Sequence, residues 1–260
     1  MIGLDFGFGP LEAEFWRFLF VMTRIGAALV AAPLFGNTGV PPQVRVIMSG
    51  AIAVFVCGWT PVAAPPALLS LSGMLALAGE TTIGLALGFV LQVAFAAPLI
   101  AAELIGAGMG MSIASAADPL SGSHSAVLGQ YFGVVLTIVF LGIGGHIDWI
   151  SLVVESYRVF PPGSAWMTPA RLQLIDTFAA DMFLTALAMA LPVLLLLLVV
   201  QIVTGVIGRS APALNLFSLG LPAGVLAGIT ALIISAPLIS DNLTDIARGA
   251  LTNASALLAR

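Results

Sequence analysis

Stretches in which apolar residues predominate alternate with shorter polar or small-residue segments along this chain. A hydrocarbon core about 30 Å thick is crossed by roughly 20 apolar residues in a helix, so each stretch of that size predicts a membrane-spanning helix. Six such stretches are present: Phe15–Phe35, Val46–Ala64, Met74–Ala102, Ser125–Gly145, Met182–Ile207 and Leu214–Ser240. The pattern predicts an all-α integral membrane protein with about six apolar helices.

Prolines fall within or near the ends of these predicted helices, at Pro98, Pro192, Pro222 and Pro237. A proline inside a helix removes a backbone hydrogen bond, so we expect kinked or broken helices. Such breaks are tolerated at membrane depth only where neighbouring protein or a water-filled cavity satisfies the freed backbone groups. Extensive contact between helices is therefore expected.

Glycines recur at four-residue spacing in several predicted helices, and small residues at this spacing let helix backbones approach closely. The excess over chance is modest, so it indicates packing and not function. The glycines concerned are Gly84 with Gly88, Gly106 with Gly110, Gly129 with Gly133, and Gly220 with Gly224 and Gly228.

The segment between the fourth and fifth apolar stretches, His146–Asp181, is too polar to span lipid easily. Trp149–Phe160 within it has an apolar side and an outward side carrying Glu155 and Arg158, which predicts an interfacial helix. The arginines show no clear positive-inside bias, so orientation stays open, as does the alternative that some segments are re-entrant or buried in an assembly. With no repeat or low-complexity tail, residues 1–260 are expected to form a single domain.

The composition excludes several classes of protein. Hydrophobic residues make up 60% of the chain and charged residues 8%, too few to coat a soluble domain. All eight basic residues are arginine and the net charge is −4, so no basic stripe is present to bind nucleic acid. Cys57 is the one cysteine, which excludes an intramolecular disulfide and a cysteine-rich metal site. The acidic start, with no basic residue before Arg17, does not resemble a cleaved signal peptide.

Catalytic motifs are incomplete. Gly110-Met111-Ser112 with His124 or His146 could be drawn as a serine hydrolase, but the longer G-x-S-x-G motif is missing. The sequence has no H-E-x-x-H zinc motif, and a chain without lysine cannot form the phosphate-binding loop of an ATPase. We therefore expect no catalytic residues, no metal, no cofactor and no enzyme activity.

Charged residues within or beside the apolar stretches are the candidates for function, because burying a charge in a membrane is costly unless it is paired or hydrated. For Arg17, Glu80 and Glu103 the simpler interpretation is that they lie near helix ends and extend toward water. Arg24 lies in mid-segment, so we expect it to face protein or water and to find a carboxylate or backbone carbonyls. On this evidence an ion-coupled or small-solute permease stays open.

One run of residues carries a family resemblance. Arg209-Ser210-Ala211-Pro212-Ala213-Leu214-Asn215-Leu216-Phe217, followed by Gly220-Leu221-Pro222, resembles the FliR family, whose virulence-system counterpart is SctT. Ala213 departs from the usual glutamine and Leu221 from the common phenylalanine. The resemblance covers roughly residues 10 to 250. It includes Arg24 with Pro33, Phe35, Gly36, Pro41 and Arg45; Glu80 with Gly84 and Gly88; Met109-Gly110-Met111-Ser112 with Asp118-Pro119; and Gly145-His146 with Ser156 and Phe160-Pro161-Pro162-Gly163.

The resemblance implies a non-enzymatic subunit of the flagellar type III protein-export gate, in the bacterial inner membrane at the flagellar basal body. Its implied partners are FliP-like and FliQ-like subunits, FliB-like or FlhB-type and FlhA-type export proteins, unfolded protein substrates and membrane lipid. It also implies apolar helices paired in hairpins, with a first part similar to FliP and a last part similar to FliQ. The equivalent subunit of a virulence injectisome remains an alternative.

The resemblance also implies roles for particular residues. The glycine-rich segment from Gly106 to Gly122 resembles a plug below a pore constriction, and its candidate residues are Gly106, Met109, Gly110, Met111, Asp118 and Pro119. Glycines can bend the segment and methionines adapt to changing surfaces, although an ordinary loop would look the same. Arg209 has two open interpretations, a helix C-terminal charge and a subunit contact. The candidate subunit-contact or structural residues are Arg24, Arg45, Glu80, Arg209, Pro212, Asn215 and Phe217.

Overall fold

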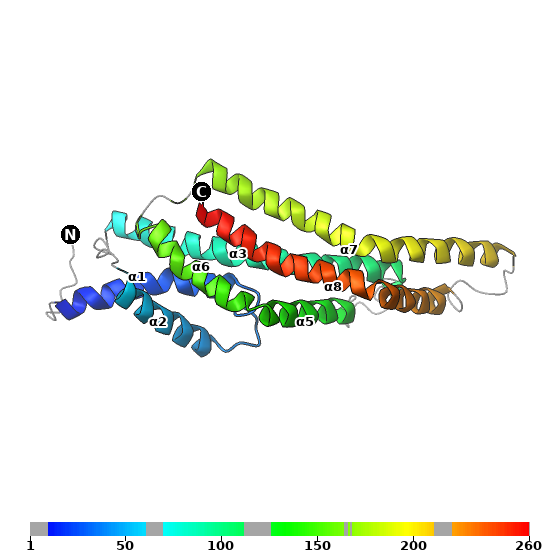
Figure 1. The fold of residues 1–260 in the computed structure, drawn as a ribbon, viewed down its shortest axis with the longest axis horizontal. Helices are drawn as coiled ribbons and strands as arrows, with labels where there is room; N and C mark the ends of the chain where they lie inside the picture. The colour runs from blue at the N-terminus through cyan, green and yellow to red at the C-terminus, as the bar shows by residue number, and fades with distance from the viewer. Residues whose placement is uncertain are drawn as a thin grey trace. The chain divides into compact units, whose positions relative to one another are not determined.

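The computed structural model describes residues 10–60, 70–111, 126–163, 166, 168–210 and 220–259. These ranges contain seven helices and no strand (Figure 1). The helices are α1 (Pro10–Ala31), α2 (Pro42–Trp59), α3 (Leu71–Gly108), α5 (Ala126–Gly142), α6 (Gly145–Val159), α7 (Pro169–Ser210) and α8 (Leu221–Ala259).

Four of these helices, α2, α3, α7 and α8, are long and apolar enough to cross a membrane. A fifth crossing is formed if α5 and α6, which are separated by a short break, are taken together as one broken span. The predicted all-α membrane fold is confirmed within the described residues. The count of about six is approximate: α1 is not among these candidates, and α5 with α6 adds at most one crossing.

Three helices extend well beyond the apolar stretches that predicted them. α3 has 38 residues, α7 has 42 and α8 has 39. The first turns of α7 lie in the semi-polar segment that was not expected to span lipid, and α8 continues past Ser240 to Ala259. Hydropathy detects the part of a helix that suits lipid, whereas a helix continues for as long as its backbone bonds and packing allow.

The helices are not interrupted at the prolines inside them, so the expected breaks are absent from the described residues, while kinks at the prolines stay a prediction. Pro98, Pro192 and Pro237 lie inside α3, α7 and α8, and each helix continues past its proline. One missing backbone bond is tolerated where neighbouring groups compensate, because unwinding more of the helix in an apolar environment would expose further unpaired groups. Pro222 lies in the first turn of α8, where a proline removes no helical bond.

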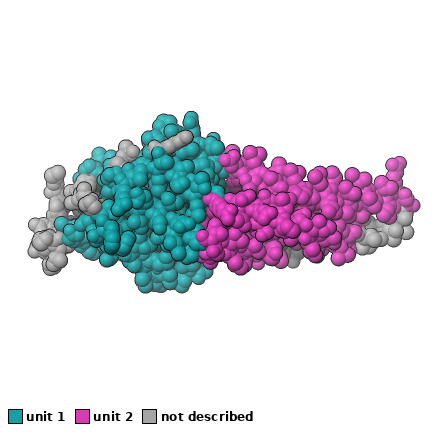
Figure 2. Space-filling model, viewed as in Figure 1, with its two compact units in different colours: residues 1–94, 144–178, 249–260 teal, residues 95–143, 179–248 magenta. Residues whose placement is uncertain are grey.

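The chain divides into two compact units (Figure 2). Unit 1 comprises residues 1–94, 144–178 and 249–260, and unit 2 comprises residues 95–143 and 179–248. Both units draw on α3, α7 and α8. The single domain over residues 1–260 stays a prediction.

Each unit has its own apolar core. In unit 1, the aromatic rings of Trp149 and Phe35 stack with centroids 5.9 Å apart, and the Trp149 side chain is buried. In unit 2, the rings of Phe95 and Phe140 meet edge to face at 5.6 Å, and both are buried. Rings in these arrangements add to the burial of their own area.

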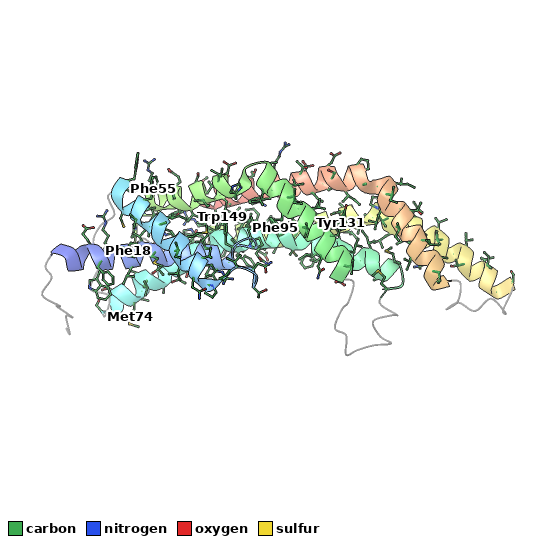
Figure 3. All side chains as sticks on the ribbon, turned by 90° about the horizontal axis from the view of Figure 1, so that it is seen from below. Phe18, Phe55, Met74, Phe95, Tyr131 and Trp149 are labelled. Carbon is green, nitrogen blue, oxygen red and sulfur yellow. The ribbon has the colours of Figure 1, made fainter. Side chains whose placement is uncertain are left out.

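Large apolar side chains are also exposed on several helices. α2 buries only Ser49, Ala53 and Val56, while Phe55 and Trp59 are exposed. Figure 3 shows Phe55 and Met74 at the periphery, each more than half exposed. α7 exposes a further series: Leu195, Leu198, Val199, Ile202, Val203 and Val206. Apolar surface of this extent needs lipid or partner protein to cover it.

Candidate functional site

The centre of unit 1 is a buried ion pair between Arg24 on α1 and Glu80 on α3. The Arg24 guanidinium donates from Nε to Glu80 Oε2 at 2.8 Å and from Nη2 to Glu80 Oε1 at 2.9 Å. The side chains are 0% and 1% exposed. This two-bond geometry is the strongest form of an arginine–carboxylate pair, and it joins residues 56 positions apart in the sequence.

The other guanidinium donors of Arg24 reach the C-terminal end of α6. Nη1 donates to the carbonyl oxygen of Ser156 at 2.8 Å, and Nη2 donates to the carbonyl oxygen of Phe160 at 2.9 Å. The guanidinium carbon lies 4.2 Å from the centroid of the Tyr157 ring. The Ser156 carbonyl oxygen also accepts from the Phe160 amide at 2.9 Å, so Arg24 is its second donor. A cation at a helix C-terminus is stabilised by the helix dipole.

Two expectations about these charges have different outcomes. The expectation that Arg24 finds a carboxylate and backbone carbonyls inside the protein is confirmed. The expectation that Glu80 extends toward water from a helix end is wrong, because its side chain is buried against Arg24 and also accepts a bond from the Gly163 amide at 3.3 Å. Glu80 lies in the third turn of α3, which begins at Leu71, and its side chain faces Arg24 of α1 and the Gly163 amide and not the solvent.

Two aromatic residues of α6 complete this network, and the sequence did not single them out for it. Tyr157 donates its hydroxyl to the carbonyl oxygen of Val21 at 2.6 Å. Trp149 donates its indole nitrogen to the carbonyl oxygen of Leu87 at 3.2 Å. Side-chain bonds of α6 therefore reach both α1 and α3. The amphipathic pattern of α6 was the signal available, but it was interpreted as a membrane-surface helix.

The predicted amphipathic character of α6 is confirmed. Trp149 and Val153 are buried, whereas Glu155 and Arg158 are exposed and pair with each other at 3.5 Å. The apolar side lies against protein, since Trp149 bonds to α3. A location of α6 at a membrane surface stays a prediction.

Glycines at the contact of α1 with α3 let the two helix backbones approach closely beside the ion pair. A Cβ added at Gly84 would overlap the carbonyl oxygen of Arg24, and one added at Gly88 would lie 2.6 Å from the carbonyl oxygen of Ala28. No other residue type fits either position without separating the two backbones. The predicted packing role of this glycine pair is confirmed.

Arg45, at the start of α2, holds the loop between α1 and α2. Its Nε donates to the carbonyl oxygen of Phe35 at 2.8 Å, and its Nη2 donates to the carbonyl oxygen of Val40 at 3.0 Å. A third carbonyl, that of Asn37, also accepts from Nη2. These bonds support a structural role inside the chain, while a contact of Arg45 with another subunit stays a prediction.

Unit 2 contains the described part of the predicted plug segment, residues 106–111. α3 ends at Gly108, whose carbonyl oxygen accepts a hydrogen bond from Gln201 Nε2 on α7 at 2.8 Å. The next residue, Met109, is 5% exposed. Gly110 has φ of 84°, in the left-handed region that favours glycine, so the chain turns sharply there.

Met109 fills a notch made by two glycines of α8. A Cβ added at Gly228 would lie 2.5 Å from Met109 Cε, and one added at Gly224 would lie 2.9 Å from the Met109 carbonyl oxygen. Gly224 and Gly228 therefore admit the methionine side chain and backbone directly against α8. The predicted close approach at these two glycines is confirmed, and its partner is the start of the predicted plug.

The remaining candidates are only partly within the described residues. Arg209 is exposed in the last turn of α7, where a cation complements the helix dipole. Asp118, Pro119, Pro212, Asn215 and Phe217 lie outside the described residues. The structure thus brings Arg24 and Glu80 together, and it places Arg45 on a separate set of carbonyls.

In the described ranges, no group of three or more histidine, cysteine or acidic side chains could hold a metal ion. Ser112 and His124, two residues of the serine hydrolase alternative, lie outside the described ranges. In the described residues, the buried charges, their carbonyl acceptors and the glycine contacts all support the packing of helices.

The similarity to known proteins extends over nearly the whole chain. The family model described as "Bacterial export proteins, family 1" matches residues 15–250. The flagellar biosynthetic protein FliR of Pectobacterium carotovorum is 31% identical over 225 residues, covering 86% of this chain and 84% of the relative. FliR of Escherichia coli K12 is 31% identical over 230 residues, covering 88% and 86%. FliR of Bacillus subtilis 168 is 30% identical over 224 residues, covering 85% and 86%.

Proposed function

The chain belongs to the bacterial export proteins, family 1, and from this premise we propose that it acts without catalysis as a subunit of the flagellar type III export gate. The observation that carries this conclusion is the family match over residues 15–250, together with several FliR relatives at about 30% identity over most of the chain. Four long apolar helices agree with an export component of the inner membrane.

The partners in this proposal are FliP-like and FliQ-like gate subunits, with FlhB-type and FlhA-type export proteins nearby at the flagellar basal body. The exposed apolar faces of α2 and α7 support it, because they provide surface for neighbouring subunits as well as for lipid. Unfolded flagellar proteins are the cargo. A gate subunit needs no reactive group, since its work is to form and close a passage.

The buried network of unit 1 holds three helices of such a subunit together. Arg24, Glu80 and Tyr157 join α1, α3 and α6 by side-chain bonds that none of these helices could satisfy alone. Breaking one bond leaves a buried polar group without its partner, so the three helices are expected to move together. A passage for unfolded protein requires walls that keep their arrangement while cargo passes.

The segment beginning at Gly106 is the proposed plug, with Gly110, Met111, Asp118 and Pro119 further along it. Met109 acts at its base as an anchor, because its side chain lies in the notch of Gly224 and Gly228. A narrow apolar constriction excludes water and so stops ions without a charged barrier.

Deleting residues 108–114 is expected to raise ion leak through assembled gates. Unchanged leak in a gate that still assembles would make this segment a simple connector.

The function is tested by deleting the gene in its own bacterium and measuring flagellar proteins in the culture medium. Export is expected to stop and to return when the gene is supplied on a plasmid. Normal export in the deletion strain would contradict the proposal.

Co-expression with the FliP-like and FliQ-like subunits tests the partners, and the chain is expected to gain protease resistance. A stable, monodisperse monomer without that gain would instead favour a small-solute permease.

A further inference from the structure

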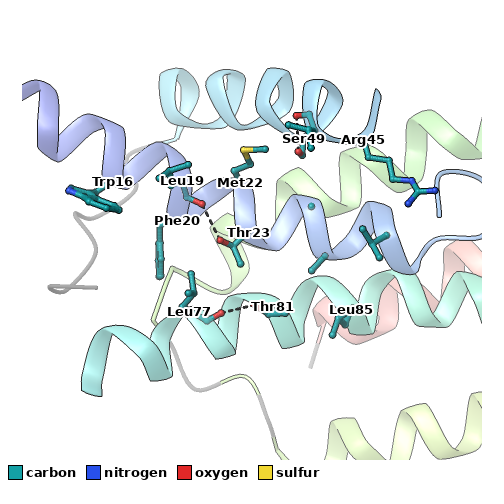
Figure 4. A pocket seen from close by; sticks show the side chains of 14 residues that line it. Trp16, Leu19, Phe20, Met22, Thr23, Arg45, Ser49, Leu77, Thr81 and Leu85 are labelled. Carbon is teal, nitrogen blue, oxygen red and sulfur yellow. Dashed lines mark hydrogen bonds between the residues drawn. The ribbon is translucent and has the colours of Figure 1, made fainter. Parts of the chain in front are cut away.

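A groove of about 700 Å³ runs along α1 in unit 1, between α2 and α3. Its floor and walls are mainly apolar, and Figure 4 shows Trp16 at one end and Arg45 at the other. Val30 follows Trp16 by 14 positions in α1, so the groove extends over about 21 Å at 1.5 Å per residue. That length exceeds one leaflet of the hydrocarbon core, about 15 Å.

The polar groups in the groove are already satisfied within their own helices. Thr23 donates to the carbonyl oxygen of Leu19 at 3.0 Å, Ser49 to that of Val46 at 3.0 Å, and Thr81 to that of Leu77 at 2.9 Å. The walls therefore offer an occupant apolar contact and few directional bonds. An occupant with polar groups along its length would lose hydration there without replacement.

Arg45 is the one charged residue among those that line the groove. None of the ion pairs in the described part of the chain includes it. Its Nε and Nη2 donate to loop carbonyls, which keep the guanidinium in place without neutralising its charge. It lies at the start of α2 beside the loop that follows α1, a location suited to the headgroup level of a membrane.

We propose that this groove binds one anionic phospholipid, with an acyl chain along α1 and the phosphate beside Arg45. The charge of the site and its apolar walls match the two ends of such a lipid. A helix is about 10 Å across with its side chains. An acyl chain is narrower and needs no backbone partners. The bound lipid fills the space between α1, α2 and α3.

Gly26 provides a position from which a larger side chain can be introduced into the groove. It lines the groove, and a Cβ added there would meet nothing within 4 Å. Gly26→Phe therefore places a ring in the space of the acyl chain. Gly58 on α2 also has open space around a Cβ but does not line the groove, so Gly58→Phe is the matched control. Arg45→Gln removes the charge and tests the headgroup contact.

The experiment uses the chain co-purified with its partner subunits in mild detergent. The complex is mixed with equal amounts of phosphatidylglycerol and phosphatidylethanolamine, and native mass spectrometry counts the lipids that stay bound. Wild type and Gly58→Phe are expected to retain phosphatidylglycerol, whereas Gly26→Phe is expected to retain about tenfold less, equivalent to about 1.4 kcal/mol. Arg45→Gln is expected to lose the preference for phosphatidylglycerol.

Three results would overturn the assignment. The first is wild type that retains no lipid after the detergent wash. The second is Gly26→Phe that retains as much phosphatidylglycerol as Gly58→Phe. The third is efficient cross-linking of Gly26→Cys to another subunit, because the occupant would then be protein. Arg45→Gln could fail to fold because the bonds of Arg45 to the loop are lost. In that case the result with Gly26→Phe still decides the proposal.

Discussion

Replacing Arg24 by methionine tests the buried network directly. Methionine has a similar length and no charge, so the change removes both bonds to Glu80 and both bonds to the carbonyl oxygens at the end of α6. The Glu80 carboxylate, 1% exposed, then keeps only the Gly163 amide at 3.3 Å among the partners seen in the described residues. Removing one member of a buried ion pair costs about 3–5 kcal/mol.

Removing both charges together should be less harmful. In the double variant Arg24→Met, Glu80→Met no buried carboxylate is left, and the main remaining cost is the carbonyl oxygen of Phe160 without its donor, about 1–3 kcal/mol. The double variant is therefore expected to be more stable than Arg24→Met alone. Arg158→Met is the matched control, because its pair with Glu155 is exposed and worth at most about 1 kcal/mol.

The free energy of unfolding can be measured by titrating SDS into the co-expressed complex in mild detergent. Tryptophan fluorescence follows the transition, since Trp149 is buried and bonded to Leu87 in the same network. The reasoning fails if Arg24→Met loses no more stability than Arg158→Met. It also fails if the losses of the two single variants add in the double variant, because independent sites add and coupled ones do not.

Three further variants test the other contacts. Gly84→Ala is expected to destabilise the fold by about 1–3 kcal/mol, because the added Cβ overlaps α1. Gly79→Ala is the control: its Cβ meets open space, so it should be neutral or stabilising by about 0.5–1 kcal/mol. Equal SDS midpoints for the two variants would refute the close contact. Tyr157→Phe is expected to cost about 0.5–1.5 kcal/mol, because the bond from the hydroxyl to the carbonyl oxygen of Val21 is lost while that carbonyl stays within α1, and no change in the same titration would show that this bond is dispensable. Met109→Ala empties the α8 notch at a cost of about 2–5 kcal/mol and should raise ion leak through assembled gates; leak equal to wild type would contradict the anchor role.

The sequence predicted the environment of Arg24 but not its partner. A charge in the middle of an apolar stretch must be satisfied, and this rule holds whatever the fold. Which carboxylate satisfies it depends on how α1 and α3 pack, and Glu80 is 56 residues away in the chain. Position relative to the end of an apolar stretch says nothing about which way a side chain faces. Glu80 was therefore interpreted as a residue that extends toward water, although it is buried.

The ends of the long helices could not be derived from hydropathy for a related reason. Lipid selects apolar residues, so the predicted apolar stretches lie within α3 and α7 and, from Leu221 onward, within α8. The extensions, such as Pro169–Asp181 of α7, mix polar and apolar residues. Some of their apolar positions are covered by protein contacts, as at Phe178, which is buried, whereas Leu172 is exposed. Contacts of this kind depend on the tertiary structure, and a window of local hydropathy contains no information about them.

Glycine spacing shows both the strength and the limit of a sequence pattern. Gly224 and Gly228 indicated a helix face that another backbone could approach, and the structure places the Met109 backbone and side chain there. The pattern could not identify that neighbour, because a small-residue face accepts any group of the right shape. It follows that the same notch admits a different occupant once Met109 leaves it. If the proposed plug withdraws during export, the vacated face of α8 is expected to become apolar surface that cargo or a neighbouring helix must cover, which would couple opening of the segment to a contact elsewhere in the gate.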